Sequence, residues 1–484
     1  MARLKILHVA AEAHPLIKTG GLADVAGALP AALVAQGADA RLLLPAYPAV
    51  LAAADGVEAV GASIGAAFGA ARVALLRARM PGSGLPLYLI DAPWLYGRAG
   101  NPYVDPDGLG WADNHLRFGL LGWIAAQLSA GGLDPEWAPD VVHAHDWHAG
   151  LAPVYLREHP ATRARSVFTI HNLAFQGRFA QETAVTLGLP AGLLTPQLLE
   201  FHGDLSFMKG GLICADRVTT VSPTYAREIL TPEYGEGLEG VIRTRGAQLS
   251  GILNGVDTDH WNPATDMLIA HTYDAQRITG KTTNKRVLRA ELGLDAGAHG
   301  PLFAVVSRLV GQKGLDLLLH AAPGALARGA QLAVLGSGER SMEAAFTALA
   351  SHHPGQVAVR IGFDEGLSHR FFAGADAVIV PSRFEPCGLT QLYGLRYGTP
   401  PVVRRAGGLA DTVIDEAAGE GATGFVFDEP AAPALAAALM RAIDVFEKPR
   451  RWRALMRAGM QTPVSWAPAA RAYLELYDGL LRTS

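Results

Sequence analysis

The sequence predicts an α/β protein built from two doubly wound domains, and three observations support this. Its 484 residues are too many for one hydrophobic core. An apolar strand at 4–10 leads through a Gly-rich loop into an Ala/Leu-rich helix that ends at Gly37, and Arg41 begins the next strand, which is a βαβ opening. A second strand-helix series begins at 302–306. We expect the domains to join near 255–265 and to face each other across a cleft.

The composition excludes several classes of protein. Half of the residues are hydrophobic and 18% are charged, and the formal charge is 41 − 45 = −4, which argues against a basic nucleic-acid-binding face. The two cysteines, Cys214 and Cys387, predict no disulfide framework and fit a reducing cytosol. The chain opens on a strand with no signal or transit segment, and no apolar run reaches ~18 residues. We therefore expect a cytoplasmic protein that does not bind membranes.

The first strand is followed by Lys18-Thr19-Gly20-Gly21, directly before a helix. Two glycines let the backbone approach a ligand, a lysine supplies a cation, and a helix N-terminus favours negative charge. The order of residues is not that of a Walker A loop. From these residues alone, phosphate binding and simple tight packing are equally good interpretations.

A strand ending in Val141-Val142-His143-Ala144-His145 and continuing to His148 suggests a metal site. A metal-dependent hydrolase using His143, His145 and His148 is therefore an alternative function. Against it, further ligands do not recur at later strand ends in a compatible order, and the eight short strand-helix repeats of a barrel are absent. We interpret His143 and His148 as hydrogen-bonded histidines at a strand end.

Two further polar groups follow strands in the first half. His171-Asn172 comes after the apolar run 166–170, where a lone histidine is more often structural than functional. Asp257-Thr258-Asp259 forms a D-x-D, but two acids in three residues are common by chance and these follow an Asn-Gly turn. We interpret this D-x-D as the exit toward the linker and expect no metal there.

The second series places two cations on its first strand-to-helix loop. Arg308 and Lys313 follow the strand at 302–306. An arginine can bind phosphate oxygens in bidentate fashion and a lysine acts as a point charge, so the pair is a plausible clamp for a diphosphate. Solvated surface cations are an equally common outcome for such a pair.

The segment 381–404 carries the strongest functional pattern. It follows the apolar strand 375–380, is punctuated by Pro381, Pro386 and Gly388, and has helix-compatible spacing from 389 to 397. Glu385 is thus expected on a loop at the carboxyl end of a strand, before a helix N-terminus. Open parallel sheets bind their ligands at this position.

Two motifs in the expected order reveal a resemblance. Glu385-Pro386-Cys387-Gly388-Leu389-Thr390 and Lys18-Thr19-Gly20-Gly21-Leu22-Ala23-Asp24-Val25 resemble the two signatures of bacterial glycogen synthases and plant starch synthases, and intermediate blocks agree over nearly the whole chain. These are retaining glucosyltransferases of the GT-B architecture, with two Rossmann-like domains. The resemblance implies an acceptor-side domain at 1–255, a donor-side domain at 256–460, and a C-terminal helix at 461–484 that crosses back onto the first domain.

The resemblance also implies the site residues. The residues implied in catalysis are Glu385, His171, Asp146, Arg308 and Lys313. The implied sugar pocket includes Tyr103 and Asn172. Phe363 stands where family members often carry a tyrosine that stacks on the base, and phenylalanine keeps the stacking surface without the hydroxyl. Donor-binding roles fall to Lys18, Gly20, Gly21, Asp24, Asn254, Arg308, Lys313, Phe363, Cys387, Gly388, Leu389 and Thr390.

The implied reaction is transfer of glucose from ADP-glucose to the non-reducing end of an α-1,4-glucan such as glycogen, with retention of configuration. No cofactor or metal is expected, because cations of the protein would stabilise the departing diphosphate. The residues themselves do not separate ADP-glucose from UDP-glucose. A phosphorylase-like GT-B enzyme is a second alternative, although the sequence shows no evident segment for a pyridoxal-phosphate lysine.

Overall fold

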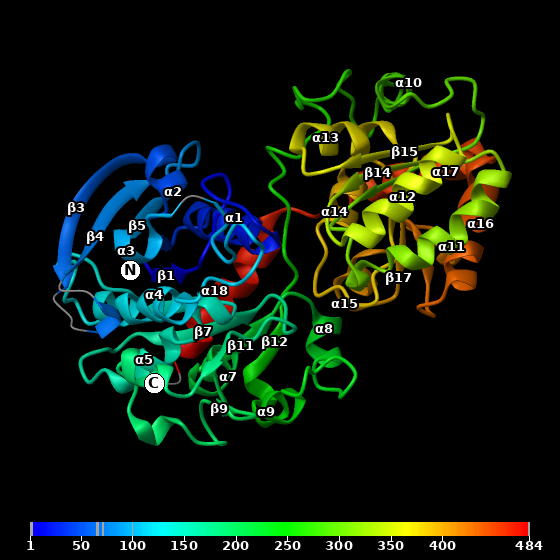
Figure 1. The fold of residues 1–484 in the computed structure, drawn as a ribbon. Helices are drawn as coiled ribbons and strands as arrows, with labels where there is room; N and C mark the ends of the chain where they lie inside the picture. The colour runs from blue at the N-terminus through cyan, green and yellow to red at the C-terminus, as the bar shows by residue number, and fades with distance from the viewer. Residues whose placement is uncertain (1–2, 64–66, 70–71, 99, 483–484) are drawn as a thin grey trace. The chain divides into compact units, whose positions relative to one another are not determined.

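The computed structural model describes residues 3–63, 67–69, 72–98 and 100–482, and the chain divides into two compact units. The first unit consists of Met1–Gly255 and Trp466–Ser484, and the second of Val256–Ser465 (Figure 1). The chain thus returns to the first unit at 465/466, later than the predicted boundary at 460/461. Both units are α/β, as predicted.

The first unit is built on a nine-stranded sheet with the order β12-β11-β7-β6-β1-β2-β5-β4-β3. The strands from β12 to β5 are parallel, and β4 and β3 extend the sheet as an antiparallel edge. The strands are β1 (Lys5–Val9), β2 (Asp39–Pro45), β3 (Asp55–Ser63), β4 (Val73–Arg79), β5 (Pro86–Asp91), β6 (Val141–His145), β7 (Arg165–Ile170), β11 (Arg217–Thr220) and β12 (Leu249–Gly251). A small antiparallel sheet contains β8 (Arg178–Ala180), β10 (Asp204–Ser206) and β9 (Glu200–Phe201).

The first strand of the chain lies inside this sheet, between β2 and β6. From β1 the chain forms β2, then the edge strand β3, and returns through β4 to β5 beside β2; it then crosses to the other side of β1 to form β6, β7, β11 and β12. The strand order therefore reverses between β1 and β6. Loops at the carboxyl ends of strands diverge at such a point, and the crevice between them is where open α/β sheets bind ligands.

Helices occupy the connections of this unit, and several of them pack against the sheet. They are α1 (Gly21–Ala35), α2 (Pro48–Ala53), α3 (Pro93–Tyr96), α4 (Asn114–Ser129), α5 (Ala152–Glu158), α6 (Thr183–Thr186), α7 (Phe207–Cys214), α8 (Pro223–Glu228) and α9 (Glu239–Thr244). The C-terminal helix α18 (Trp466–Arg482) packs against α1, where Tyr473 and Tyr477 join a buried cluster with Val25, Leu29 and Leu33. This helix therefore belongs to the first unit.

The second unit is a six-stranded parallel sheet with the order β15-β14-β13-β16-β17-β18. Its first strand again lies inside the sheet, so the strand order reverses between β13 and β16. The sheet strands are β13 (Leu302–Val306), β14 (Gln331–Gly336), β15 (Val357–Ile361), β16 (Ala377–Val380), β17 (Pro401–Arg404) and β18 (Phe425–Phe427). All residues of β14, β16, β17 and β18 are buried, which explains their continuous apolar runs.

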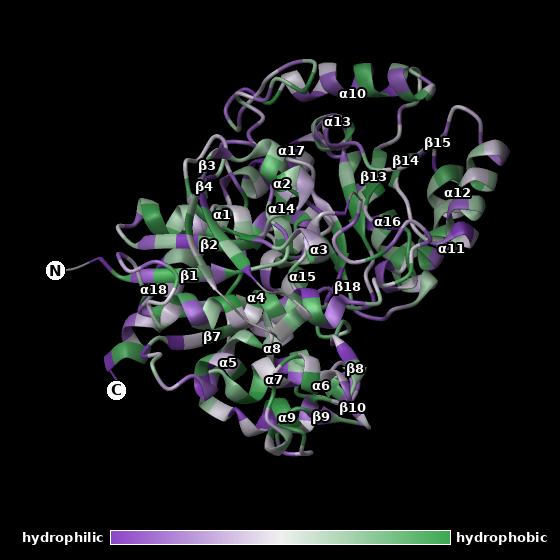
Figure 2. Cartoon of the chain, turned by 60° about the vertical axis from the view of Figure 1, so that its left-hand side comes forward, coloured by the Kyte–Doolittle hydropathy of each residue, from purple (hydrophilic) through white to green (hydrophobic). Residues whose placement is uncertain are grey.

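Helices pack around the second sheet. They are α10 (Gly280–Leu292), α11 (Leu315–Ala327), α12 (Arg340–His352), α13 (Glu365–Gly374), α14 (Thr390–Arg396), α15 (Gly407–Thr412), α16 (Ala432–Phe446) and α17 (Pro449–Gln461). Hydrophobic and hydrophilic residues alternate along α10 (Figure 2), whose Leu288 and Leu292 pack with Leu367 and Phe371 of α13. In the part of the chain that the structure describes, no helix is long and apolar enough to span a membrane.

Candidate active site

In the second unit, an ion pair joins the loops after β13 and β16, where the strand order of the sheet reverses. Lys313 comes from the loop after β13, and Glu385 from the loop after β16. The Lys313 Nζ lies 2.6 Å from Glu385 Oε2, and the Ser382 hydroxyl donates to the same oxygen at 2.8 Å. Glu385 is 6% exposed, so these partners provide hydrogen bonds that water cannot supply to this oxygen.

Glycines of neighbouring loops hold the Glu385 loop closely. The Gly408 N–H donates to the Glu385 carbonyl at 3.0 Å. A Cβ on Gly407, which has φ 43°, would lie 2.0 Å from that carbonyl oxygen, and one on Gly314 would lie 2.1 Å from the carbonyl oxygen of Pro381. These close approaches require glycine, and they fix the loop that presents Glu385.

Arginines reinforce the same loop from both sides. Arg383 makes a bidentate ion pair with Asp316, at 2.7 and 2.6 Å, and also donates to the Gly311 carbonyl at 2.8 Å. Arg404 donates to the Arg383 carbonyl. The loops after β13 and β16, the start of α11 and the end of β17 are therefore joined by charged hydrogen bonds. Sequence reasoning missed these arginines, since their partners are far away along the chain.

Arg308 differs from Lys313. Its side chain is exposed, and no ion pair or side-chain hydrogen bond holds its guanidinium among the described residues. It lies at the carboxyl end of β13, five residues before a lysine that is already fixed. The structure thus provides one anchored cation and one available cation on the same loop.

The remaining predicted residues of this unit lie in two places. Cys387 is buried, while Gly388, Leu389 and Thr390 are half-buried at the start of α14, where the Thr390 hydroxyl donates to the Val306 carbonyl at 3.3 Å. Phe363 lies in the loop after β15 with 75% of its surface exposed. An aromatic ring this exposed is available for stacking.

In the first unit, Lys18 and Asp24 meet each other at the N-terminal end of α1. The Lys18 Nζ lies 2.7 Å from Asp24 Oδ1, and both side chains are about one-fifth exposed, at 23% and 19%. Gly20 is extended and Gly21 is the first residue of the helix. A ligand anion here would compete with Asp24 for the lysine.

Glu12 lies in the same loop and was missed by sequence reasoning. It is 2% exposed and accepts the Thr19 N–H, while burial raises its pKa to about 7 against the lowering effect of that bond. Burial also raises the pKa of Tyr103, and Glu12 raises it further, although the Tyr103 hydroxyl has no hydrogen-bond partner of good geometry among the described residues. The Tyr103 ring stacks on His148 with centroids 4.5 Å apart.

Asp146 directly follows β6 and has a strained backbone conformation. Its φ of 59° is rare for a residue other than glycine, and such strain concentrates at functional sites. Its Oδ1 accepts the His171 N–H at 3.3 Å, which joins the ends of β6 and β7. Burial raises the pKa of Asp146 to about 7, although backbone N–H groups of His171, Asn172 and Trp147 lower it.

A chain of hydrogen-bonded histidines ends at the half-buried His171. His8 Nδ1 lies 3.0 Å from His145 Nε2, and His145 Nδ1 lies 3.0 Å from His171 Nε2. Burial lowers the pKa of all three, to about 3 for His8 and His171, so each ring is neutral. His8 Nε2 has no partner among the described residues. Because unpaired buried N–H groups are rare, His8 carries its proton on Nδ1, and His171 then keeps its proton on Nδ1.

These bonds contradict the alternative of a metal site at the end of β6. His143 Nδ1 lies 2.7 Å from the Tyr477 hydroxyl, and its Nε2 lies 2.6 Å from the Thr169 hydroxyl. Both nitrogens of His145 are also engaged, and the histidine grouped with these two is His8 rather than His148. The prediction of hydrogen bonds is confirmed for His143 but is wrong at His148 Nδ1, which has no partner among the described residues.

Asn254 and Asn172 complete the predicted set. The Asn254 Oδ1 is buried without a hydrogen-bond partner among the described residues, as expected of an atom that awaits a ligand. The Asn172 Oδ1 accepts the Ala174 N–H at 3.1 Å and so shapes the turn after His171.

Two family models match the two units. The starch synthase catalytic domain matches residues 5–244, and the glycosyl transferases group 1 model matches 294–457. Together with two sheets that reverse at β1/β6 and β13/β16, these matches define a glycosyltransferase with the GT-B architecture.

Relatives show which family of glycosyltransferases the chain belongs to. A glycogen synthase of Roseobacter denitrificans is 52% identical over 482 residues, covering 99% of this chain and 100% of the relative, and one of Leptothrix cholodnii is 54% identical over 484 residues, covering 98% and 99%. The solved catalytic domain of starch synthase IV from Arabidopsis thaliana, bound to ADP and acarbose, is 32% identical with a TM-score of 0.90, covering 99% and 100%. The chain belongs to the glycogen synthase family and is a glucosyltransferase.

Proposed function

We propose that this enzyme transfers glucose from ADP-glucose to the non-reducing 4-hydroxyl of an α-1,4-glucan, with retention of configuration, and so elongates glycogen. The observation that carries the proposal is the Lys313–Glu385 pair at the reversal point of the second sheet. It combines a cation for the departing diphosphate with a carboxylate for the sugar. The binding of ADP and acarbose by the starch synthase IV relative supports a nucleotide donor and a glucan-like acceptor.

The roles follow from the charges and their burial. Arg308 and Lys313 stabilise the negative charge that develops on the leaving diphosphate, Arg308 with donors that the protein leaves available. Glu385, buried at 6% exposure, stabilises the positive charge that develops on the glucosyl ring. Phe363 stacks on the base, and Cys387, Gly388, Leu389 and Thr390 bind the donor.

The first unit contributes hydrogen-bonding groups that bind the sugar and the donor. His171 donates from Nδ1, because its Nε2 accepts from the histidine chain. Asp146 supports His171 through the backbone bond at 3.3 Å. The sugar pocket includes Tyr103 and Asn172. The remaining donor contacts come from Lys18, Gly20, Gly21, Asp24 and Asn254, whose Oδ1 is unpaired.

A metal ion is not part of the proposed reaction, because the protein's own cations perform its electrostatic task. A metal-dependent reaction would instead require a cluster of free ligand atoms among these residues, but His143 and His145 use both of their ring nitrogens for hydrogen bonds.

The test is incorporation of labelled glucose into glycogen by the purified full chain, with ADP-glucose or UDP-glucose, each with and without EDTA. We expect elongation with ADP-glucose that EDTA leaves unchanged. Elongation with UDP-glucose alone would overturn the donor assignment, and loss of activity in EDTA would overturn the metal-independent reaction. A parallel assay with glucose 1-phosphate tests the phosphorylase-like alternative, which requires elongation from that donor.

A further inference from the structure

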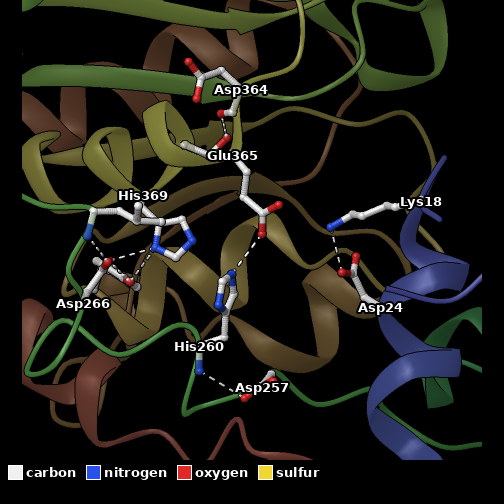
Figure 3. A network of polar contacts seen from close by, with 11 residues as sticks. Lys18, Asp24, Asp257, His260, Asp266, Asp364, Glu365 and His369 are labelled. Carbon is white, nitrogen blue, oxygen red and sulfur yellow. Dashed lines mark hydrogen bonds and ion pairs between the residues drawn. The ribbon is translucent and has the colours of Figure 1, made fainter. Parts of the chain in front are cut away.

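Three metal-ligating side chains converge in the second unit, away from Lys313 and Glu385. They are His260, Glu365 and His369, and one ligand atom of each lies within 4.8 Å of the others. His260 Nε2 lies 2.9 Å from Glu365 Oε1, and the rings of His260 and His369 have centroids 5.0 Å apart (Figure 3). The group combines two imidazoles with a carboxylate.

His369 is fixed in the manner of a metal-binding histidine. Its Nδ1 lies 2.8 Å from Asp266 Oδ2, and the same oxygen accepts the Tyr397 hydroxyl at 2.6 Å. Trp261 stacks on the ring with centroids 3.8 Å apart. A carboxylate that holds one imidazole nitrogen orients the other nitrogen and increases its basicity toward a metal ion.

The other ring nitrogen of His369 has no partner. His369 is 0% exposed, and its Nε2 is buried without a hydrogen bond among the described residues. Figure 3 shows this nitrogen on the side of the ring that faces His260 and Glu365. In the tautomer that donates Nδ1–H to Asp266, Nε2 carries a free lone pair. A buried acceptor without a partner is the expected state of a ligand atom for a cation.

The backbone of helix α13 places Glu365 on the same side as His369. Glu365 and His369 are four residues apart at the start of α13, so their side chains lie on one face of the helix. The Asp364 carboxylate accepts the Leu367 N–H at 2.8 Å and caps this helix, which leaves Asp364 outside the group of ligands.

The D-x-D motif Asp257-Thr258-Asp259 contributes to this group indirectly, by positioning His260. Asp257 Oδ1 accepts the N–H groups of Asp259 and His260, at 3.0 and 3.1 Å. Its carboxylate therefore shapes the turn that presents His260.

We propose that His260, Glu365 and His369 bind a divalent transition-metal ion such as Zn²⁺, through imidazole nitrogens and a carboxylate oxygen. Two imidazoles favour Zn²⁺ over Mg²⁺ or Ca²⁺, which prefer oxygen ligands. Three protein ligands leave a fourth position for water, because the His260 and Glu365 side chains are 38% and 29% exposed. The metal ties the turn at 257–260 to α13, and this site is independent of the proposed transfer reaction.

The test is titration of Zn²⁺ into the EDTA-dialysed full chain by calorimetry, with Co²⁺ absorption as a second readout. We expect one Zn²⁺ per chain, an intense visible Co²⁺ spectrum of tetrahedral type, and a higher unfolding temperature with Zn²⁺. His260→Asn changes an exposed side chain, and both it and Glu365→Gln should weaken binding at least about tenfold.

The matched control is His299→Asn, which removes an exposed histidine of the same unit outside the group. It should bind Zn²⁺ like the wild type. Absence of Zn²⁺ binding in the wild type, or equal affinity in wild type, His260→Asn and Glu365→Gln, overturns the proposal. Transfer activity in EDTA tests only the proposed function, so the two failures are distinguishable.

Discussion

The ammonium of Lys313 lies 2.6 Å from the Glu385 carboxylate, although the two residues are 72 positions apart in the chain. They meet because β13 and β16 are neighbours in the sheet and the loops that follow them leave the same edge. The pair is mostly buried, with side chains 17% and 7% exposed. The Lys313 ammonium and the Glu385 carboxylate are therefore held in position before a ligand binds.

Lys313→Ala should lose about 2–4 kcal/mol of transition-state stabilisation, as expected when one preorganised group that stabilises charge is removed. The measurement is kcat/KM for glucosyl transfer. Lys285→Ala is the matched control, because Lys285 forms a similarly buried ion pair with Asp376, at 2.5 Å. Equal losses of activity in both variants would show that ion-pair burial, and not a role in catalysis, explains the effect.

Arg308→Ala should cause a loss of activity of the same order, but without a change in stability beyond about 0.5 kcal/mol, because the side chain is exposed and makes no ion pair among the described residues. Transfer rates and denaturant unfolding measured on the same preparation separate the two quantities. Unchanged turnover in Arg308→Ala and Lys313→Ala together would remove the diphosphate clamp.

Glu385→Gln should nearly abolish transfer while the protein remains folded, because the amide keeps the size of the side chain and loses its charge. Thermal unfolding of the variant should stay close to that of the wild type. A variant that unfolds, or one that keeps its turnover, would contradict the assignment of Glu385 to the chemistry.

Gly407→Ala should reduce activity strongly through displacement of Glu385, since the new Cβ would lie 2.0 Å from the Glu385 carbonyl oxygen. Gly419→Ala is a strict control, because Gly419 also has a positive φ, 84°, but a Cβ added there would meet no atom within 4 Å. Both substitutions incur backbone strain, but only Gly407→Ala also places a Cβ against the Glu385 loop. We therefore expect a change in kcat for Gly407→Ala alone. Similar kcat values in the two variants would show that the Glu385 loop tolerates displacement.

Acid should destabilise the first unit through its buried histidines. Burial lowers the pKa of His8 to about 3, and those of His143 and His145 well below their usual value. Below about pH 6.5 the unfolded chain therefore binds more protons than the folded chain, and each histidine removes about 1.4 kcal/mol of stability per pH unit.

Two carboxyls oppose this trend. Burial raises the pKa values of Glu12 and Asp146 to about 7, so each contributes stability at low pH that is lost as the pH rises toward 7. The histidines outnumber them, so net stability should fall between about pH 6.5 and 5. Denaturant unfolding at several pH values checks this, and His8→Phe should reduce the slope by about one proton. A slope unchanged by that variant would contradict the neutral state of His8.

Much of the fold could be predicted because its signals are local. The βαβ opening, the strand at 302–306 and the helices near 390 and 466 all have patterns that span a few residues, and the structure contains each of them. Helix α4 was not predicted, because residues on all its faces are buried and its apolar pattern has no clear period.

The candidate site was predictable as a set of strand-end residues and less so as a set of contacts. Lys313 and Glu385 carry recognisable motifs, whereas Glu12 and His8 are single polar residues within apolar segments. The hydrogen bond between His143 and Tyr477, and the one between His369 and Asp266, join residues with no common pattern in the sequence.

The sequence by itself determined which residues follow strands and which family they resemble, because alternation, turns and motifs are properties of neighbouring residues. The tertiary structure decided which of those strand ends lie side by side. The order β7-β6-β1 joins His8, His145 and His171, and the order β13-β16 joins Lys313 and Glu385. Sheet order depends on how distant segments bury their apolar faces together, and burial then sets the charge states of the side chains between them.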